Sequence, residues 1–239
     1  MYQEQRILAI IPARGGSKGI PNKNIIDLCG KPLLAYSILA GLNSNYIDTV
    51  MVSTDSAKIR DIALSFGASV PFLRPAEYAT DTAKTIDCML HAIQELSRNG
   101  QHYDYVVLLQ PTQPIRKPEW IDSAIELLIN HPKEDSLVSV CPVSEHPILM
   151  RTITKEGTLK SLLPMSSTVR RQDFPDVYRV NGSIYINKIN SNFNADTSLN
   201  DNHLPYYMEE QYSIDIDSYE DLQKAENYYL SSSYNPFSI

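Results

Sequence analysis

Residues 6–12 read RILAIIP, a continuous run of apolar and largely β-branched side chains. A run without polar alternation is typical of a strand buried on both faces, as in a parallel sheet covered by helices. Residues 48–53 (DTVMVS) and 103–109 (YDYVVLL) repeat the pattern, and stretches with helical spacing lie between them. The alternation predicts βαβ units in an α/β fold, with a mostly parallel sheet between helices.

The same patterns place the remaining elements. Helical spacing predicts helices over residues 32–42, 57–66, 82–96, 120–129 and 219–230. Apolar runs predict shorter strands over residues 68–73, 137–141, 183–187 and 212–216. The alternation is lost over about forty residues, which is too long for a structureless loop in a compact fold. We therefore expect an α/β domain formed by residues 1–143 and 181–230, an inserted subdomain at 144–180 and a tail at 231–239.

Composition excludes several classes of protein. The 239 residues are 43% hydrophobic, enough for a large core, and the formal charge of −7 argues against a nucleic-acid or anionic membrane partner. The longest nearly apolar stretch, residues 33–42, is about half of a membrane span, and no leader pattern precedes it. Cys29, Cys88 and Cys141 have neither disulfide nor zinc spacing. We expect a cytoplasmic protein with reduced thiols.

The charge is unevenly distributed along the chain. Residues 1–31 hold five bases and two acids, and residues 151–188 hold seven bases and three acids. Residues 195–239 hold one base and nine acids. An ordinary scatter of charged residues over the surface explains such asymmetry as well as a functional role does, unless local motifs favour the functional role.

The stretch that follows the first strand carries such a motif. Residues 13–24 read ARGGSKGIPNKN, in which three glycines allow backbone N–H groups to approach an anion and three bases add positive charge. The spacing fits neither a P-loop nor a dinucleotide fingerprint. A glycine-rich turn alone is often only a turn, but together with the bases and the preceding strand it predicts a cradle for a triphosphate or pyrophosphate.

This loop resembles a signature of the CMP-N-acylneuraminate (CMP-sialic acid) cytidylyltransferases, a family that includes legionaminic and pseudaminic acid cytidylyltransferases. The similarity spans nearly the whole chain and follows the family order. It is carried by residues 11–24 (IPARGGSKGIPNKN), 74–83 (RPAEYATDTA), 109–116 (LQPTQPIR), 144–147 (SEHP), 170–186 (RRQDFPDVYRVNGSIYI) and 213–217 (SIDID). The related 3-deoxy-manno-octulosonate cytidylyltransferases share the fold but continue the first loop differently.

The resemblance implies a reaction and an architecture. CTP and a nine-carbon acidic 2-keto sugar would give a CMP-sugar and pyrophosphate, by in-line attack of the anomeric hydroxyl on the α-phosphate with Mg²⁺ (or Mn²⁺). The implied fold is a Rossmann-like domain of the nucleotide-diphospho-sugar transferase type, with a small insertion that dimerises. The implied assembly is a homodimer with shared active sites.

The resemblance also assigns residues to the nucleotide. Arg14, Lys23 and Asp217 match catalytic positions of the family. The positions that match its nucleotide site are Ala13, Arg14, Gly16, Lys18, Asn24, Arg74 and Asp81. For any single lysine here, a solvated surface role is the alternative.

The residues that match the family's sugar-contacting region lie later in the chain, and they are Gln110, Arg171, Arg179, Asn181 and Tyr185. Arginine suits a carboxylate because its planar fork donates two parallel hydrogen bonds. The resemblance implies that Arg171 serves the partner's site. Some sialic acid enzymes have a lysine shortly after the SEHP-like motif, whereas this chain has Ile148, Leu149 and Met150, and its first base is Arg151.

Two carboxylates form the predicted metal site. Asp215 and Asp217 flank Ile216 in the apolar run at 212–216, so a strand would place both carboxylates on one face. Two such charges are stabilised by a cation, and hard oxygen ligands suit Mg²⁺. The resemblance implies the same role. The alternative for Asp217 is that it caps the following helix.

Three other functions compete with this interpretation. One is a 3-deoxy-manno-octulosonate cytidylyltransferase. Another is a nucleotide-sugar glycosyltransferase, because residues 215–217 also fit a DxD metal motif, although such an enzyme has less need of a triphosphate cradle. The last is a catalytically silent nucleotide-binding regulator, against which the intact Arg14, Lys23, Asp215 and Asp217 argue.

Overall fold

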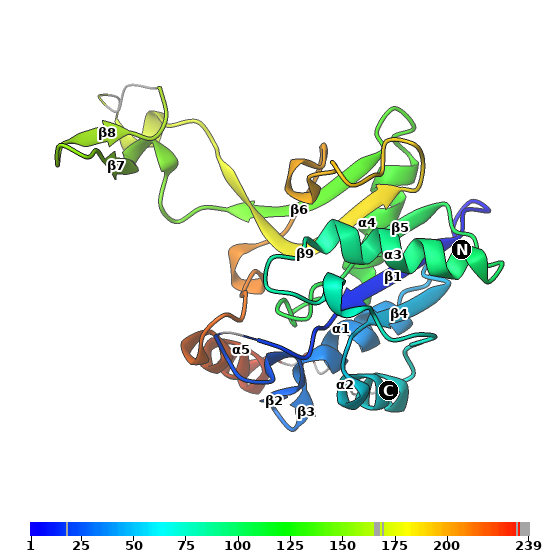
Figure 1. Ribbon diagram of the computed structural model, residues 1–239. Helices are drawn as coiled ribbons and strands as arrows, with labels where there is room; N and C mark the ends of the chain where they lie inside the picture. Colours follow the sequence, from blue (N-terminus) through cyan, green and yellow to red (C-terminus); the bar gives the residue numbers. More distant parts are fainter. Residues whose placement is uncertain (18, 165–167, 169, 233, 235–239) are drawn as a thin grey trace.

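The computed structural model describes residues 1–17, 19–164, 168, 170–232 and 234. Its centre is a six-stranded sheet in the order β10-β6-β9-β5-β1-β4 (Figure 1). These strands are β1 (Ile7–Pro12), β4 (Thr49–Ser53), β5 (Tyr105–Leu108), β6 (Ser136–Pro142), β9 (Tyr178–Lys188) and β10 (Leu204–Tyr207). Only β9 runs against its neighbours in this sheet, because it pairs antiparallel with both β5 and β6. The prediction of a mostly parallel sheet is confirmed.

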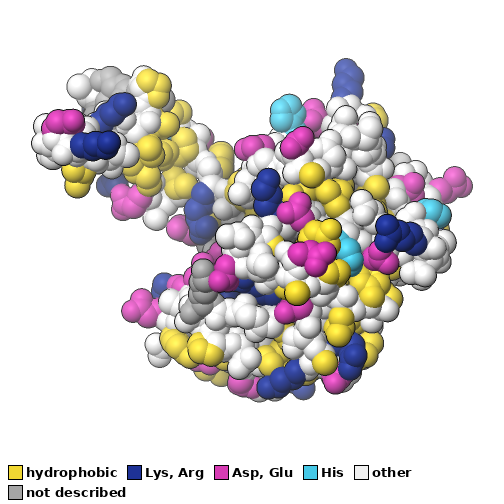
Figure 2. All heavy atoms as spheres, in the orientation of Figure 1, with side chains coloured by type: hydrophobic (Ala, Val, Ile, Leu, Met, Phe, Trp, Pro, Cys, Tyr) yellow, Lys and Arg dark blue, Asp and Glu magenta, His cyan; other side chains and the backbone are white. Residues whose placement is uncertain are grey.

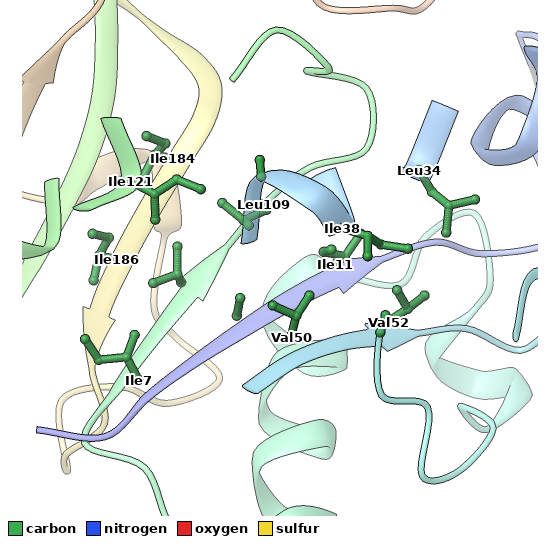
Figure 3. Packing of buried hydrophobic residues seen from close by; sticks show 14 of the residues in the cluster. Ile7, Ile11, Leu34, Ile38, Val50, Val52, Leu109, Ile121, Ile184 and Ile186 are labelled. Atoms are coloured by element: carbon green, nitrogen blue, oxygen red, sulfur yellow. The ribbon is translucent and has the colours of Figure 1, made fainter. Parts of the chain in front are cut away.

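Helices cover both faces of the sheet, as predicted. They are α1 (Leu33–Leu42), α2 (Ala57–Ser65), α3 (Thr85–Arg98), α4 (Pro118–Ile129) and α5 (Tyr219–Ser231). Strand β1 explains the two layers, because successive side chains of a strand point to opposite faces. Ile7 and Ile11 pack with α1, α2 and α4 (Figure 3). Leu8 and Ile10 pack on the other face, with α3.

Two short hairpins lie outside the central sheet. One pairs β2 (Asp27–Leu28) with β3 (Lys31–Pro32). The other pairs β7 (Arg151–Ile153) with β8 (Leu159–Ser161), and Figure 1 shows it standing away from the sheet and its helices. It belongs to the segment that connects β6 to β9, residues 143–177, which we call the arm. The predicted insertion at 144–180 covers most of the arm and the start of β9, and its role in dimerisation stays a prediction.

Two predicted strands are wrong. Residues 68–73 make only an isolated bridge between Met51 and Ser69. Residues 212–216 begin at the end of a 3-10 helix and continue without strand pairing, since the Ile216 N–H donates to the Thr112 carbonyl. Their apolar alternation is satisfied differently: Ile214 and Ile216 pack against α5 in a third core cluster.

One strand of the central sheet was missed. Residues 204–207, LPYY, form the edge strand β10 parallel to β6. Proline is accepted at a sheet edge, where one side of the strand needs no partner, but it weakens a strand prediction. At the C-terminus, α5 continues to Ser231, and most of the predicted tail lies outside the described residues. Within the described part of the chain, no helix has the length and apolarity needed to cross a membrane.

Candidate active site

A cleft of about 440 Å³, which we call the main cleft, opens at the carboxyl ends of β1, β4 and β5. This is the edge at which open α/β sheets bind ligands. The loops that follow β1 and β5, the segment before α3 and the segment before α5 all contribute to it. The residues of the predicted site that line it are Arg14, Lys23, Asn24, Arg74, Asp81, Gln110 and Asp217.

Hydrogen bonds from the backbone shape the loop after β1. The Ala13 N–H donates to the Ser53 carbonyl at 2.9 Å, and the Gly15 N–H donates to Asp55 Oδ1 at 2.8 Å. Asn24 Nδ2 donates to the Arg14 carbonyl at 2.9 Å, so this amide closes the loop. Gly16 is exposed at the tip, and the predicted Lys18 lies outside the described residues. Sequence reasoning missed Asp55, which only the pairing of β1 with β4 brings beneath the loop.

Two ion pairs join residues of the main cleft that are distant in sequence. Arg14 Nη1 lies 2.8 Å from Asp81 Oδ1, and Lys23 Nζ lies 2.8 Å from Asp217 Oδ1. The Lys23 side chain is only 16% exposed, so its charge faces the cleft interior. Both bases were predicted to hold phosphates. An anionic ligand in the cleft would compete with the two carboxylates for these cations, whereas a divalent cation would compete with Lys23 for Asp217.

Close packing holds the segment at residues 215–217 against the first loop. A Cβ atom built on Gly19 would lie 2.8 Å from the Asp217 carbonyl oxygen, so any other residue at position 19 would push the two segments apart. The Ile216 N–H also ties this segment to the loop after β5, as described above. The carboxylates are therefore positioned by contacts with two loops and not by strand alternation.

Asp215 and Asp217 fit a hard divalent cation by their chemistry. Loss of hydration raises the pKa of the Asp215 carboxyl although the residue is partly open to solvent, a hydrogen bond to Thr112 opposes this, and the Asp217 charge adds to it. A cation beside the pair would oppose both effects, because an opposite charge favours the ionised carboxylates. No set of three or more His, Cys, Asp or Glu side chains suited to a metal occurs among the described residues. Two protein carboxylates with the remaining ligands from phosphate and water are typical of Mg²⁺ sites.

A capping box fixes the helix that follows these carboxylates. The Ser218 hydroxyl accepts a hydrogen bond from the Asp221 N–H, and the Asp221 carboxylate accepts from the Ser218 N–H. The Ser218 side chain lowers the pKa of Asp221 to about 2, assisted by Lys224. The predicted alternative, that Asp217 caps this helix, is wrong, because Ser218 is the cap.

Asp221→Ala removes the N3 half of the capping box and is expected to cost about 1 kcal/mol of stability at pH 7, the size of effect usual for lost helix-capping interactions. The folded-state pKa lies below the ordinary value of 3.8, so this contribution is present above about pH 4 and disappears as the pH falls toward 2. Urea unfolding of both proteins at several pH values measures the difference. A stability difference that stays constant from pH 7 to pH 2.5 would contradict the assignment.

A buried arginine lies at the inner end of the main cleft. The Arg74 side chain is 5% exposed, its Nη1 lies 3.0 Å from the Cys88 sulfur, and its Nη2 lies 3.9 Å from Asp55. The Cys88 thiol in turn donates to the Ser53 hydroxyl. Arg74 Nε has no hydrogen-bond partner among the described residues. This cation therefore retains unused donor capacity, and it is one of the residues that line the main cleft.

A second hollow of about 320 Å³, the side pocket, adjoins the main cleft and shares Lys84, Thr85 and Gln110 with it. Gln110 and Tyr185, both predicted for the sugar, line this pocket. The Tyr185 hydroxyl donates to Asn200 Oδ1 at 3.1 Å, and burial raises its pKa to about 12, so it remains a neutral donor. Sequence reasoning missed Lys84, which directly precedes α3. It also missed residues 197–200, which carry no motif and lie in the loop between β9 and β10.

The structure does not bring the other predicted sugar residues to these pockets. Asn181 is buried, and its amide bonds to Ser139 and Ser213, so its role here is structural. Arg179 Nη2 donates to the Ser213 carbonyl. Arg171 lies on the arm, where it lines a separate hollow and approaches Glu145 at 4.0 Å. Within this single chain these residues are therefore apart from the side pocket.

Comparison with known proteins shows which family this chain belongs to. A sequence model described as cytidylyltransferase matches residues 8–234, nearly the entire chain. The chain belongs to the cytidylyltransferase family. This confirms the resemblance found in the motifs, and the protein is a nucleotidyltransferase.

Named relatives of this cytidylyltransferase act on acid sugars. It is 44% identical to the CMP-N,N'-diacetyllegionaminic acid synthase of Legionella pneumophila over 76% of this chain and 77% of that protein. It is 32% identical to the pseudaminic acid cytidylyltransferase of Campylobacter jejuni over 93% and 95% of the two chains. An N-acylneuraminate cytidylyltransferase of Streptococcus agalactiae is 35% identical over 90% of this chain, which spans about half of that longer protein.

Solved structures show the same fold at low sequence identity. A CMP:2-keto-3-deoxy-manno-octonic acid synthetase complexed with CTP has a TM-score of 0.70 at 15% identity, covering 94% of this chain and 98% of that one. A 4-diphosphocytidyl-2C-methyl-D-erythritol synthase has a TM-score of 0.67 at 12% identity, with the same coverage. The α/β fold of the cytidylyltransferase is thus shared by enzymes with different substrates, and the substrate must be argued from the site.

Proposed function

We propose that this cytidylyltransferase transfers CMP from CTP to a nine-carbon acidic 2-keto sugar. The observation that carries the proposal is the junction of two pockets: a main cleft lined by several cations opens, across Gln110, into a smaller polar side pocket. The anomeric hydroxyl oxygen of a sugar in the side pocket forms the new bond to the α-phosphorus. The bond to the β-phosphate oxygen breaks, pyrophosphate leaves, and the hydroxyl proton is released.

Charge neutralisation is the main task of the protein in this reaction, because phosphoryl transfer depends on positioning and electrostatics. Arg14 and Lys23 face the main cleft and exchange Asp81 and Asp217 for phosphate oxygens when the triphosphate binds. Arg74 lines the same cleft with a buried guanidinium and is assigned to the cytidine in this proposal. Asn24 supports the loop that carries Arg14.

Mg²⁺ (or Mn²⁺) is the proposed cofactor, and Asp215 and Asp217 are the residues that would hold it. Bound beside the phosphates, such an ion supplies positive charge that neutralises the departing pyrophosphate. Asp217 is already directed toward the phosphate loop, as its ion pair with Lys23 demonstrates. The close approach of Gly19 to the Asp217 backbone and the Ser218 cap of α5 hold the segment that carries these carboxylates.

The substrate class follows from the side pocket and the relatives together. Relatives with 32–44% identity carry names of nine-carbon acid sugar enzymes, whereas the octonic acid synthetase shares only the fold at 15% identity. This favours a nine-carbon sugar over the eight-carbon alternative. Because the Legionella relative is named for N,N'-diacetyllegionaminic acid, this sugar is the first to test. A glycosyltransferase would leave the cationic main cleft without a triphosphate to bind, and a silent regulator would have no need of the intact carboxylates Asp215 and Asp217.

The arm supports a homodimer whose active sites are shared. Large apolar side chains on it are exposed, including Ile153 at 76% and Leu159 at 72%, and Figure 2 shows apolar side chains along this projection. A hairpin with such a surface cannot bury it against its own domain, because it stands away from the sheet. A second copy of the chain covers it in this proposal and brings Arg171 toward the other copy's sugar. The free thiols of Cys29, Cys88 and Cys141 and the use of CTP support a cytoplasmic location.

Pyrophosphate release tests the proposed function. The purified protein with Mg²⁺ is mixed with each of CTP, UTP, GTP and ATP, and with each of four sugars. The sugars are N,N'-diacetyllegionaminic acid, pseudaminic acid, N-acetylneuraminic acid and the eight-carbon 3-deoxy-manno-octulosonic acid. We expect release only with CTP and a nine-carbon acid. Release with the eight-carbon acid alone supports the octulosonate alternative, and no release with any sugar refutes the proposal.

A further inference from the structure

Lys84 lies at the junction of the two pockets. It lines both the main cleft and the side pocket, and it is the residue directly before the 14-residue helix α3. The helix fixes the backbone at this point, while the side chain remains exposed. Among the described residues, no hydrogen bond or ion pair engages the Lys84 ammonium. Its charge is therefore available to a ligand.

The side pocket has a simple charge balance. Lys84 is the sole charged side chain among the described residues that line it, and the others are apolar, hydroxyl or amide side chains such as Tyr185, Thr197 and Asn200. The arginines expected to bind a sugar carboxylate, Arg171 and Arg179, line neither pocket of this chain. A pocket for an acidic sugar thus holds a single cation from its own chain.

We propose that Lys84 binds the carboxylate of the sugar and selects acidic over neutral sugars, an inference that rests on the proposed function. An ammonium group offers three donors on a flexible stem and forms a charge-assisted hydrogen bond with a carboxylate. Among its described lining residues, the main cleft has three other cations for the triphosphate: Arg14, Lys23 and Arg74. The described lining of the side pocket has no cation besides Lys84, so the carboxylate depends on Lys84 more than the nucleotide does.

The test compares wild type with Lys84→Met and Lys84→Arg, using an acid sugar that the enzyme accepts and its neutral C1 methyl ester. Calorimetric titration gives the affinity for both compounds, and steady-state kinetics give KM for CTP and for the sugar. We expect Lys84→Met to weaken binding and raise KM for the acid about 10- to 100-fold, with KM for CTP changed less than about threefold. The ester binds both proteins equally, and Lys84→Arg restores most of the affinity for the acid.

Lys133→Met is the matched control, since it removes the same charge from an exposed position that lines neither pocket. It is expected to behave as wild type, and all variants are expected to keep the wild-type melting temperature. If wild type prefers acid to ester and Lys84→Met retains that preference, the Lys84 assignment is overturned while the proposed function stands. An equal rise in KM for CTP also overturns it. A wild type that neither binds nor consumes any acid sugar refutes both.

Discussion

Asp217→Asn is expected to lower turnover at saturating CTP and sugar by about 10²- to 10³-fold. The substitution keeps the shape of the side chain but removes a charge that pairs with Lys23 at 2.8 Å and that we assign to Mg²⁺ binding. Loss of one preorganised charge at a phosphoryl-transfer site has an effect of this size. Initial rates over a range of Mg²⁺ concentrations measure it. The half-saturating Mg²⁺ concentration is expected to rise at least about tenfold, because one of two ionised oxygen ligands becomes an amide.

Glu220→Gln is the control for this experiment. Glu220 is exposed in the first turn of α5, three residues beyond Asp217, and the substitution makes the same change of charge. Its rate is expected to stay within about twofold of wild type, as for surface positions away from the site. Wild-type activity in Asp217→Asn, or an equal loss in Glu220→Gln, would contradict a specific role for Asp217.

Lys23→Met is expected to lower kcat/KM for CTP by about 10²-fold or more. Its ammonium is mostly buried in the main cleft, where a charge acts more strongly than at the surface. Unlike the Asp217 defect, this loss is not relieved by added Mg²⁺, because Lys23 contacts the phosphates in our proposal and not the metal. Kinetics at two Mg²⁺ concentrations, with Lys133→Met as the control, separate the two roles.

The double variant Asp217→Asn/Lys23→Met makes the coupling measurable. The two side chains are in contact, so their effects are expected to be less than additive on the free-energy scale. Full additivity would show that the two residues act independently. That outcome would contradict a shared site at the phosphates.

Much of the fold is predictable because its buried core strands are continuous apolar runs in the sequence. RILAIIP predicts β1 since its consecutive residues Ile7 to Ile11 are all buried, on one face of the sheet or the other. The same logic fails at residues 212–216, where alternating apolar residues pack into a small cluster beside α5 and the backbone bonds to the loop after β5. Strand β9 begins five residues before the predicted 183–187 because its first part pairs with β6 beneath the arm. Pairing between distant segments leaves no local pattern.

The candidate site also has a part that the sequence predicts and a part that it does not. Its nucleotide side is predictable because the glycines, bases and amide of one loop are adjacent in sequence, and the structure places Arg14, Lys23 and Asn24 at one cleft. Asp55 and Lys84 are not predictable in this way, since each is a single residue brought in by the packing of another element. The sugar side depends on loop geometry that leaves no local pattern, and Arg171 lies on the arm, where it lines a hollow apart from the side pocket.

In our proposal this cytidylyltransferase joins CMP to an acid sugar. Incubation with CTP labelled at the α-phosphorus, Mg²⁺ and N,N'-diacetyllegionaminic, pseudaminic or N-acetylneuraminic acid tests it most directly, with products separated and identified by mass. We predict that the label moves into a CMP-sugar and that one pyrophosphate appears for each CMP-sugar formed. Label that stays in CTP with all three acids, or pyrophosphate released without a CMP-sugar, would contradict the claim.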